Sequence, residues 1–495
     1  MNLLDRIEKL GNRLPDPATL FVIGTIVIIF LSGWAQWQGW QATSRIAGDF
    51  HARSLLTSDG IWWLLSHLVD NFINFPPLGI VLVGMLGIGL AEASGLLPDM
   101  LRYFITHVPE KLLTPATVFI GVMSSLALDA GYVVLPPLAA ALYQTAGRSP
   151  LVGIAAVFAG ISAGFSANLS ITALDPLLAG LTQSGAQVLL PGYTVAVTAN
   201  WWFMIVSTVL LTLAGWLVTD WFVEPRQHKF ETSIAENPPA ATAPESSHHG
   251  LRNAVLALLV LFILVLMAVV VPGAPLYGAG EHFDRWVEAT VPLLFLLFFV
   301  PGLIYGLSSR SIKSDRDVAG ILGNTMARMG TYIVLAFFAA QFIECFKYSR
   351  LGEMLAISGG QWLASLHIPT VMLLICFIVL VMFANLLIGS ASAKYAFFAP
   401  VFVPMFMQVG ISPELTQAVY RVGDSVTNTI TPLNPYMIIM LVYLQQYSKK
   451  AGIGTLIAMM LPYTAVFAVI WSLLLVIWYL CGFALGPAGP LHITL

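Results

Sequence analysis

A polar segment inside a long apolar region, Arg421–Tyr436, carries most of the chemistry that this sequence offers. It contains an arginine, an aspartate, two asparagines, four Ser or Thr hydroxyls and two prolines. A charged side chain at mid-bilayer costs roughly 2.5–3.5 kcal/mol, so such residues mark functional sites. Pro432 and Pro435 each remove a helix hydrogen bond. We therefore predict a transmembrane helix broken at mid-membrane, with polar side chains and freed carbonyls lining a substrate and ion site.

A second segment, Ser166–Pro176, repeats this pattern in the first half of the chain. Aligned with residues 425–435, it shares Ser, Ile, Thr, Leu and Pro, and it exchanges Ser for Thr and Asp for Asn. The same Gly-x-Ser-Pro sequence precedes both segments, at Gly147–Pro150 and Gly410–Pro413. Interrupted segments at matching places in two halves are typical of inverted-repeat transporters. The pattern predicts two inverted halves, each with one broken helix.

The candidate substrate-binding residues combine two cations with neutral polar side chains. The planar fork of Arg421 matches a carboxylate and Lys394 adds a point charge, although each could instead only neutralise a neighbouring aspartate. We expect Asp424, one helical turn from Arg421, to orient the guanidinium. The residues predicted to bind substrate are Asn168, Asn385, Ser390, Ser392, Lys394, Arg421, Asp424 and Asn428.

Cation coupling needs carboxylates or neutral oxygens near the broken helices. A carboxylate beside the negative end of a half-helix attracts a cation, and it also holds a proton more readily when no metal is present. Sodium and proton coupling therefore both stay open. The residues predicted to serve coupling are Asp129, Ser170, Asp175, Asp424 and Thr427. The residues predicted as sodium ligands are Asn168, Asp175, Ser425 and Asn428.

Composition excludes several other classes of protein. The 495 residues are 58% hydrophobic and 9% charged, which is typical of an all-α polytopic membrane protein. A net charge of −3 gives no reason to expect a nucleic-acid partner. The cysteines Cys345, Cys376 and Cys481 lack metal-ligand spacing, and we expect no cofactor besides a coupling ion. The apolar segments contain no nucleophile–base pair and the chain has no phosphate-binding loop, which argues against an enzyme and against ATP-driven transport. Charges gathered in one core, rather than in a ring, argue against a channel.

Hydropathy and polar interruptions predict about nine transmembrane helices plus two re-entrant hairpins. The first half covers residues 1–223 and the second 251–495, joined by a cytoplasmic linker at 224–250. The hairpins are expected at about 112–145 and 369–409, the first with one kinked span as its alternative. The broken helices are expected at about 150–190 and 413–447. The unbroken spans are expected at 17–40, 77–97, 193–222, 251–271, 291–305, 319–342 and 455–483.

Charge placement supports this layout with the N-terminus in the cytoplasm. Of the 22 Lys and Arg residues, fourteen fall in segments predicted inside, five in segments predicted outside and three in apolar segments. Cytoplasmic loops of membrane proteins carry such an excess of basic residues. The same layout opens the first hairpin to the inside and the second to the outside, as inversion requires.

Three motifs resemble the AbgT family of aminobenzoyl-glutamate transporters: Asp129–Leu135, Ile388–Pro400 and Arg421–Pro432. The resemblance covers nearly the whole chain. It implies a homodimeric, elevator-like transporter of the bacterial inner membrane, with both hairpins and both broken helices in a mobile core. It implies cation-coupled handling of p-aminobenzoyl-glutamate, or export of p-aminobenzoate-like molecules and sulfonamide drugs. Asn434 and Leu128 depart from the residues expected in the family, an apolar and a small polar one.

Two alternatives concern the substrate. A sodium–dicarboxylate symporter has a similar plan, but we would expect Ser-Asn-Thr triplets at both hairpin tips, and Ser124–Gly131 and Asn385–Lys394 contain none. Trp201 and Trp202 could stack on an aminobenzoyl ring, although an interfacial aromatic belt explains them better.

Overall fold

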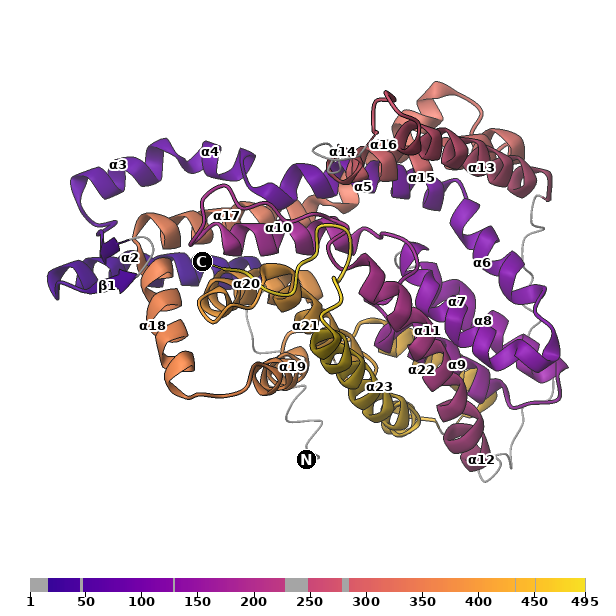
Figure 1. The fold of residues 1–495 in the computed structure, drawn as a ribbon. Helices are drawn as coiled ribbons and strands as arrows, with labels where there is room; N and C mark the ends of the chain where they lie inside the picture. Colours follow the sequence, from indigo (N-terminus) through magenta and orange to yellow (C-terminus); the bar gives the residue numbers. More distant parts are fainter. Residues whose placement is uncertain are drawn as a thin grey trace.

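The structure, a computed structural model, describes residues 17–44, 48–127, 130–227, 248–277, 285–431, 433–449 and 451–494. Nearly all regular structure in these ranges is helical (Figure 1). The exception is an antiparallel pair of short strands, β1 (Gln41–Ser44) and β2 (Gly48–His51), which follows the first predicted span. Most of the predicted linker, residues 228–247, lies outside the described residues.

Seven helices in the described part of the chain are long and apolar enough to cross a membrane, and each overlaps a predicted unbroken span. They are α2 (Pro17–Trp37), α5 (Pro76–Ala93), α11 (Trp201–Val218), α13 (His248–Val270), α15 (Thr290–Ser309), α17 (Gly330–Tyr348) and α23 (Ile453–Cys481). Shorter elements lie along the chain between the long helices, the hairpins and the broken helices. They are α3 (Ser58–Ser66), α4 (Leu68–Ile73), α6 (Leu96–Thr106), η1 (Glu110–Leu112), η3 (Thr219–Val223), α12 (Glu224–Gln227), α14 (Arg285–Glu288), α16 (Asp315–Arg328) and α18 (Leu351–Ser365).

The boundary predicted at residue 319 is wrong. The chain forms a separate helix, α16, that ends at Arg328, and the apolar helix α17 begins only at Gly330. A capping box at Ser314 starts α16, and its polar sequence gives it no reason to enter lipid. Arg328, which the prediction placed in the span, lies in the last turn of α16 and pairs with Glu92 of α5 at 3.5 Å.

Both predicted hairpins are interrupted at the polar residues from which the interruptions were predicted. The first consists of α7 (Leu113–Met123), a 3-10 turn η2 (Ser124–Ala127) and α8 (Ala130–Thr145), and the second of α19 (Thr370–Asn385) and α20 (Ala391–Met407). The helices α7 and α8 both pack on the following helix α9 (Pro150–Ala163), beside one another in Figure 1. This packing favours a hairpin over one kinked span; re-entry into the membrane stays a prediction.

The two broken helices are present. The first is α9 followed by α10 (Leu174–Ala186), and the second is α21 (Pro413–Val426) followed by α22 (Tyr436–Tyr447). Each second piece packs on the other half of the chain: α10 on α20 and α21, and α22 on α8 and α9. The halves therefore interlock around the two breaks.

Glycines allow the first piece of each broken helix to approach its hairpin closely. A Cβ at Gly160 of α9 would lie 2.4 Å from the Val118 carbonyl oxygen of α7. A Cβ at Gly423 of α21 would lie 2.7 Å from the Ile378 carbonyl oxygen of α19. Because backbone cannot move aside cheaply at such distances, neither position accepts a larger residue. Both halves thus use the same kind of close helix crossing.

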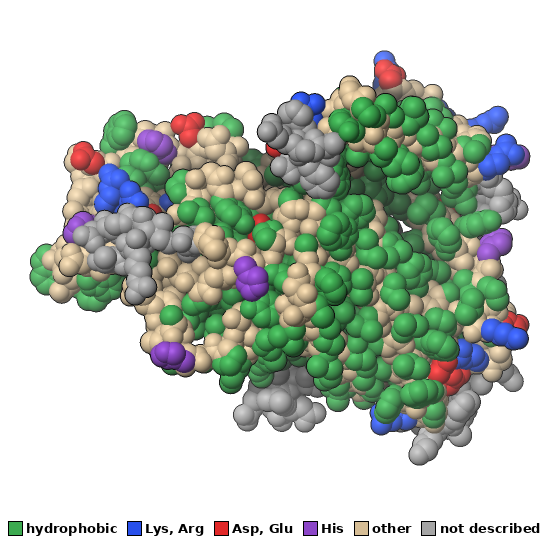
Figure 2. Space-filling view, viewed as in Figure 1, with side chains coloured by type: hydrophobic (Ala, Val, Ile, Leu, Met, Phe, Trp, Pro, Cys, Tyr) green, Lys and Arg blue, Asp and Glu red, His purple; other side chains and the backbone are tan. Residues whose placement is uncertain are grey.

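The molecular surface is largely apolar. Figure 2 shows hydrophobic side chains over most of one face, with Lys, Arg, Asp and Glu mainly at its margins. Only 6% of the apolar stretch of α13 is buried inside the protein. Exposed Leu, Val, Ile and Phe side chains on a long helix match the hydrocarbon core of a bilayer. The surface agrees with the composition: the chain is a polytopic membrane protein.

Single cysteines placed before the two Gly-x-Ser-Pro sequences test the inverted layout. Gly147 and Gly410 themselves have positive φ, so Gln144→Cys and Gln408→Cys avoid backbone strain. In a background without the three native cysteines, we expect an impermeant maleimide to label Gln144→Cys only from the inside and Gln408→Cys only from the outside. Labelling of both from one side would contradict the inversion and the hairpin arrangement with it.

Candidate substrate and ion site

The candidate site lies where helix α21, the tip of the second hairpin and the first helix break meet. All fourteen residues of α21 are buried, including Arg421 and Asp424. Lys394, in the first turns of α20, is also fully buried. Asp175 follows the first break, at the start of α10. Two cations and two carboxylates predicted from the sequence are therefore brought together.

Arg421 pairs with Asp175 across the two halves of the chain. Arg421 Nη2 donates to Asp175 Oδ1 at 2.6 Å. The other carboxylate oxygen, Oδ2, accepts from the backbone N–H of Thr172 at 2.6 Å and from its hydroxyl at 2.9 Å. These bonds fix the carboxylate at the N-terminal end of α10, where the helix dipole also favours a negative charge. Asp175 therefore holds the guanidinium in place.

Lys394 pairs with Asp424 inside the second half. Lys394 Nζ lies 2.6 Å from Asp424 Oδ1 and also donates to the side-chain oxygen of Asn385. The Asn385 amide reaches the backbone oxygen of Asp424 at 2.8 Å, Thr427 Oγ1 at 2.9 Å and Asn428 Oδ1 at 2.7 Å. The last residue of α19 thus links the hairpin tip to the C-terminal end of α21.

The expectation that Asp424 orients Arg421 is wrong. Asp424 bonds to Lys394, while the guanidinium of Arg421 bonds to Asp175. Arg421 and Asp424 are close enough on α21 to interact. The second hairpin, however, brings a cation closer to Asp424, and α10 brings an anion closer to Arg421. Each cation has a carboxylate partner, as in the alternative that the sequence left open.

The two helix breaks touch directly. The backbone N–H of Ser166 donates to Ser425 Oγ at 3.3 Å. Asn428 Nδ2 donates to the Ser162 carbonyl at 3.4 Å. Asn434, unexpected in this position, donates to the Asn428 carbonyl at 2.8 Å and to Ser162 Oγ at 3.4 Å. The site is thus built from both repeats at once.

Several buried polar atoms around the breaks have no hydrogen-bond partner among the described residues. They are Ser166 Oγ, Asn168 Oδ1, Thr431 Oγ1 and Arg421 Nε. An unpaired buried polar atom costs roughly 1–3 kcal/mol, so such atoms call for a missing partner. Three are neutral oxygens of the kind that alkali cations prefer. The fourth is a donor suited to a substrate oxygen.

Of the four predicted sodium ligands, Asn168 alone among the described residues keeps an oxygen without a partner. Asp175 uses both carboxylate oxygens, Ser425 Oγ accepts from Ser166, and Asn428 Oδ1 accepts from Asn385. Asn168 Nδ2 donates to Ser125 Oγ at 2.6 Å in the first hairpin, which leaves Oδ1 free. A sodium ion would therefore find a free oxygen ligand at Asn168, in the first break. It would find none at the carboxylate of Asp175, because both oxygens already have partners.

The remaining predicted residues lie at the edges of the site. Ser390 caps α20 and lies 3.3 Å from Ser392. Ser170 is half-buried in the first break, and Thr427 is buried beside Asn385. Asp129 lies outside the described residues.

Aromatic residues enter the site in a way the sequence did not indicate. The Trp201 indole donates to the Leu169 carbonyl in the first break at 2.9 Å, whereas Trp202 is exposed. The hydroxyl of Tyr420 lies 3.2 Å from Asp424 Oδ1. The sequence did contain one signal for Tyr420. It lies four residues before Asp424 on a predicted helix, so the two side chains lie on the same face of that helix.

Tyr132 of α8 and Tyr436 of α22 form a second aromatic feature. Their rings are parallel, with centroids 3.9 Å apart. The Tyr132 hydroxyl lies 3.1 Å from Ser162 Oγ, next to the contact between the breaks. The aromatic pair therefore joins the first hairpin to the second broken helix, next to the contact between the two breaks.

Interlocked broken helices, buried charge pairs at the breaks and an apolar exterior define a multi-pass membrane transporter. Residues 2–493 match the model of the AbgT putative transporter family. The chain belongs to this family.

Characterised relatives cover almost the whole chain. The p-aminobenzoyl-glutamate transport protein of Escherichia coli (strain K12) is 34% identical over 97% of this chain and 95% of its own. The crystal structure of the Alcanivorax borkumensis YdaH transporter is similar with a TM-score of 0.92 and 42% identity, covering 96% of this chain and all of that one. Neisseria gonorrhoeae MtrF, whose structure is described as illuminating a class of antimetabolite efflux pumps, gives 0.90 and 39%, with 99% and 100% covered. These relatives are transporters, which confirms the prediction of a transporter rather than an enzyme.

Proposed function

We propose that this protein is a cation-coupled secondary transporter of p-aminobenzoyl-glutamate and p-aminobenzoate-like aromatic carboxylates. The name of the Escherichia coli relative supports the first substrate. The description of MtrF as illuminating antimetabolite efflux pumps supports export of antimetabolites. Among these we propose the sulfonamides, which share the aminophenyl group of p-aminobenzoate. We place the protein in the bacterial inner membrane with its N-terminus in the cytoplasm, because basic residues concentrate in the segments predicted inside.

The charge balance of the site is the observation that carries the coupling proposal. Lys394 and Arg421 are neutralised by Asp424 and Asp175, and all four side chains are almost fully shielded from solvent. A substrate carboxylate entering this neutral site would add an uncompensated buried charge, which costs several kcal/mol. A cation that arrives with it removes this cost.

The cation can enter the site in two ways. A proton on Asp175 would release Arg421, whose Nε already lacks a partner, to bind the substrate carboxylate. A sodium ion on the free oxygens of Ser166, Asn168 and Thr431 would supply the same positive charge without breaking the ion pair. Either route makes substrate and cation bind together, so a gradient of one drives the other.

We infer a movement that fits the grouping of the helices. The long helices α2 and α17 pack on one another, as do α5 and α15, whereas the hairpins pack mainly on the broken helices. A scaffold of long helices and a transport core of hairpins and broken helices would allow the core to slide as a unit, in an elevator-like cycle within a homodimer.

The function is tested by flux into liposomes that contain the purified protein. We expect labelled p-aminobenzoyl-glutamate and p-aminobenzoate to accumulate when a sodium or a proton gradient is imposed, and the two gradients applied separately identify the coupling ion. Protein-free liposomes and liposomes with Arg421→Ala protein serve as controls. Absence of gradient-dependent flux of both compounds would overturn the proposal.

A further inference from the structure

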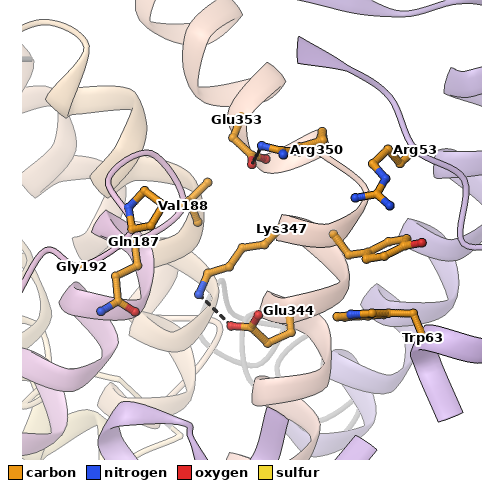
Figure 3. A pocket seen from close by; sticks show the side chains of 11 residues that line it. Arg53, Trp63, Gln187, Val188, Gly192, Glu344, Lys347, Arg350 and Glu353 are labelled. Atoms are coloured by element: carbon orange, nitrogen blue, oxygen red, sulfur yellow. Dashed lines mark hydrogen bonds and ion pairs between the residues drawn. The ribbon is translucent and has the colours of Figure 1, made fainter. Parts of the chain in front are cut away.

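A second cavity, of about 430 Å³, lies away from the core site (Figure 3). One wall is formed by residues 187–192, which follow α10, and the other by the end of α17, the start of α18 and the loop before α3. These segments lie on the predicted outer side of the membrane. Since small-molecule sites occupy about 300–1,000 Å³, the cavity is large enough for an aromatic carboxylate.

Arg53 gives this cavity a cation that no carboxylate of the described residues neutralises. The guanidinium carbon lies 4.5 Å from the ring centroid of Tyr348, and no ion pair joins Arg53 to another described residue. The ring of Trp63 stacks on the same tyrosine, with centroids 4.4 Å apart. A guanidinium placed over an aromatic ring by a cation–π contact still has N–H groups available for a carboxylate. Trp63 and Tyr348 also line the cavity and offer apolar surface for a ring.

The other charges in the cavity are paired. Lys347 Nζ lies 2.7 Å from Glu344, a pair drawn in Figure 3, and Arg350 lies 3.3 Å from Glu353 Oε1. Glu353 is 6% exposed, and its Oε2 has no hydrogen-bond partner among the described residues. Burial raises the pKa of this carboxyl, which Arg350 only partly offsets. The free oxygen of Glu353 can accept a hydrogen bond from an N–H group. The charge of Arg53 still makes the cavity attractive to an anion.

We propose that this cavity is an outer binding site for aromatic carboxylates that also carry an N–H donor. Arg53 binds the carboxylate, Trp63 and Tyr348 contact the ring, and Glu353 accepts the N–H. The choice of ligand rests on the proposed function, since p-aminobenzoyl-glutamate has all three groups. Gln187, on the opposite wall, directly follows α10, whose first turn holds Asp175. An occupant of the outer site therefore lies next to the C-terminal end of the helix whose first turn fixes Arg421 in the core.

Equilibrium binding of labelled p-aminobenzoyl-glutamate to the purified full-length protein tests the outer site. We expect two molecules per protomer for the wild type, one for Arg421→Ala, one for Arg53→Ala and none for the double variant. Arg53→Lys should weaken the outer site at least tenfold, because the lysine keeps the charge but loses the planar fork. Arg310→Ala, which removes an equally exposed arginine that does not line the cavity, is the matched control for Arg53→Ala and should keep two.

The outcomes separate this inference from the proposed function. One molecule per protomer in the wild type together with gradient-driven flux would overturn the outer site and leave the transport function standing. Loss of the second molecule in Arg53→Ala without gradient-driven flux would support the outer site and overturn the transport function. Because Arg53 is exposed, its replacement should leave the melting temperature unchanged, and a lowered melting temperature in Arg53→Ala would show a structural role instead.

Discussion

Replacing Arg421 with alanine should lower the liposome uptake of p-aminobenzoyl-glutamate about 100-fold or more. The change removes the only described guanidinium in the core site, and it leaves Asp175 buried without its partner. Truncating one member of a buried charge pair costs roughly 2–5 kcal/mol, which corresponds to a loss of affinity of about 30-fold to several thousandfold. Arg421→Lys should lose much of the affinity as well, because the charge stays but the two-point geometry goes.

A double variant separates binding from folding in this experiment. Arg421→Met with Asp175→Asn removes both charges and so avoids an unpaired buried carboxylate. We expect its melting temperature to return toward that of the wild type while uptake stays abolished. Uptake restored in the double variant would show that Arg421 only neutralises Asp175 and does not bind substrate.

Asp175→Asn alone should abolish concentrative transport but keep substrate binding. The asparagine resembles the protonated carboxyl in shape and charge, so Arg421 loses its competitor and is free to bind the substrate carboxylate. We expect binding that no longer depends on pH, and exchange of labelled for unlabelled substrate should continue. Accumulation driven by a proton gradient should fall at least tenfold, since a proton can no longer change the charge of the site at this position.

Asp424→Asn provides the comparison for Asp175→Asn. It also unpairs a buried cation, but Lys394 keeps its hydrogen bond to Asn385, so the freed charge stays partly satisfied. We expect this variant to lose accumulation and also to bind substrate more weakly than Asp175→Asn, because Asp424 fixes the hairpin tip on α21. Both measurements use the same liposomes with imposed sodium and proton gradients. Full coupled transport by both variants would make the two carboxylates plain counter-ions.

The sequence by itself determined the elements of this protein. Stretches of apolar residues gave the unbroken spans, because burial in lipid needs about 20 of them in a row. Polar residues and prolines at 166–176 and 425–435 gave the two helix breaks, because these residue types disrupt a helix locally. The α16–α17 boundary was missed because Met329 separates the two helices without a proline to mark the break. The strands β1 and β2 were missed because four-residue strands leave no clear period.

Only the tertiary structure decided which charge meets which. Arg421 and Asp175 are 246 positions apart, and their contact depends on how α10 packs against α21. Asp424 was the nearer candidate along the chain, but α20 brings Lys394 to it. The outer cavity depends on packing even more, since Arg53, Gln187 and Lys347 belong to three distant segments. Local sequence determines where helices end and which of their residues are polar. Which side chains from distant segments pair with each other depends on how the segments pack, and this cannot be derived from any single stretch of sequence.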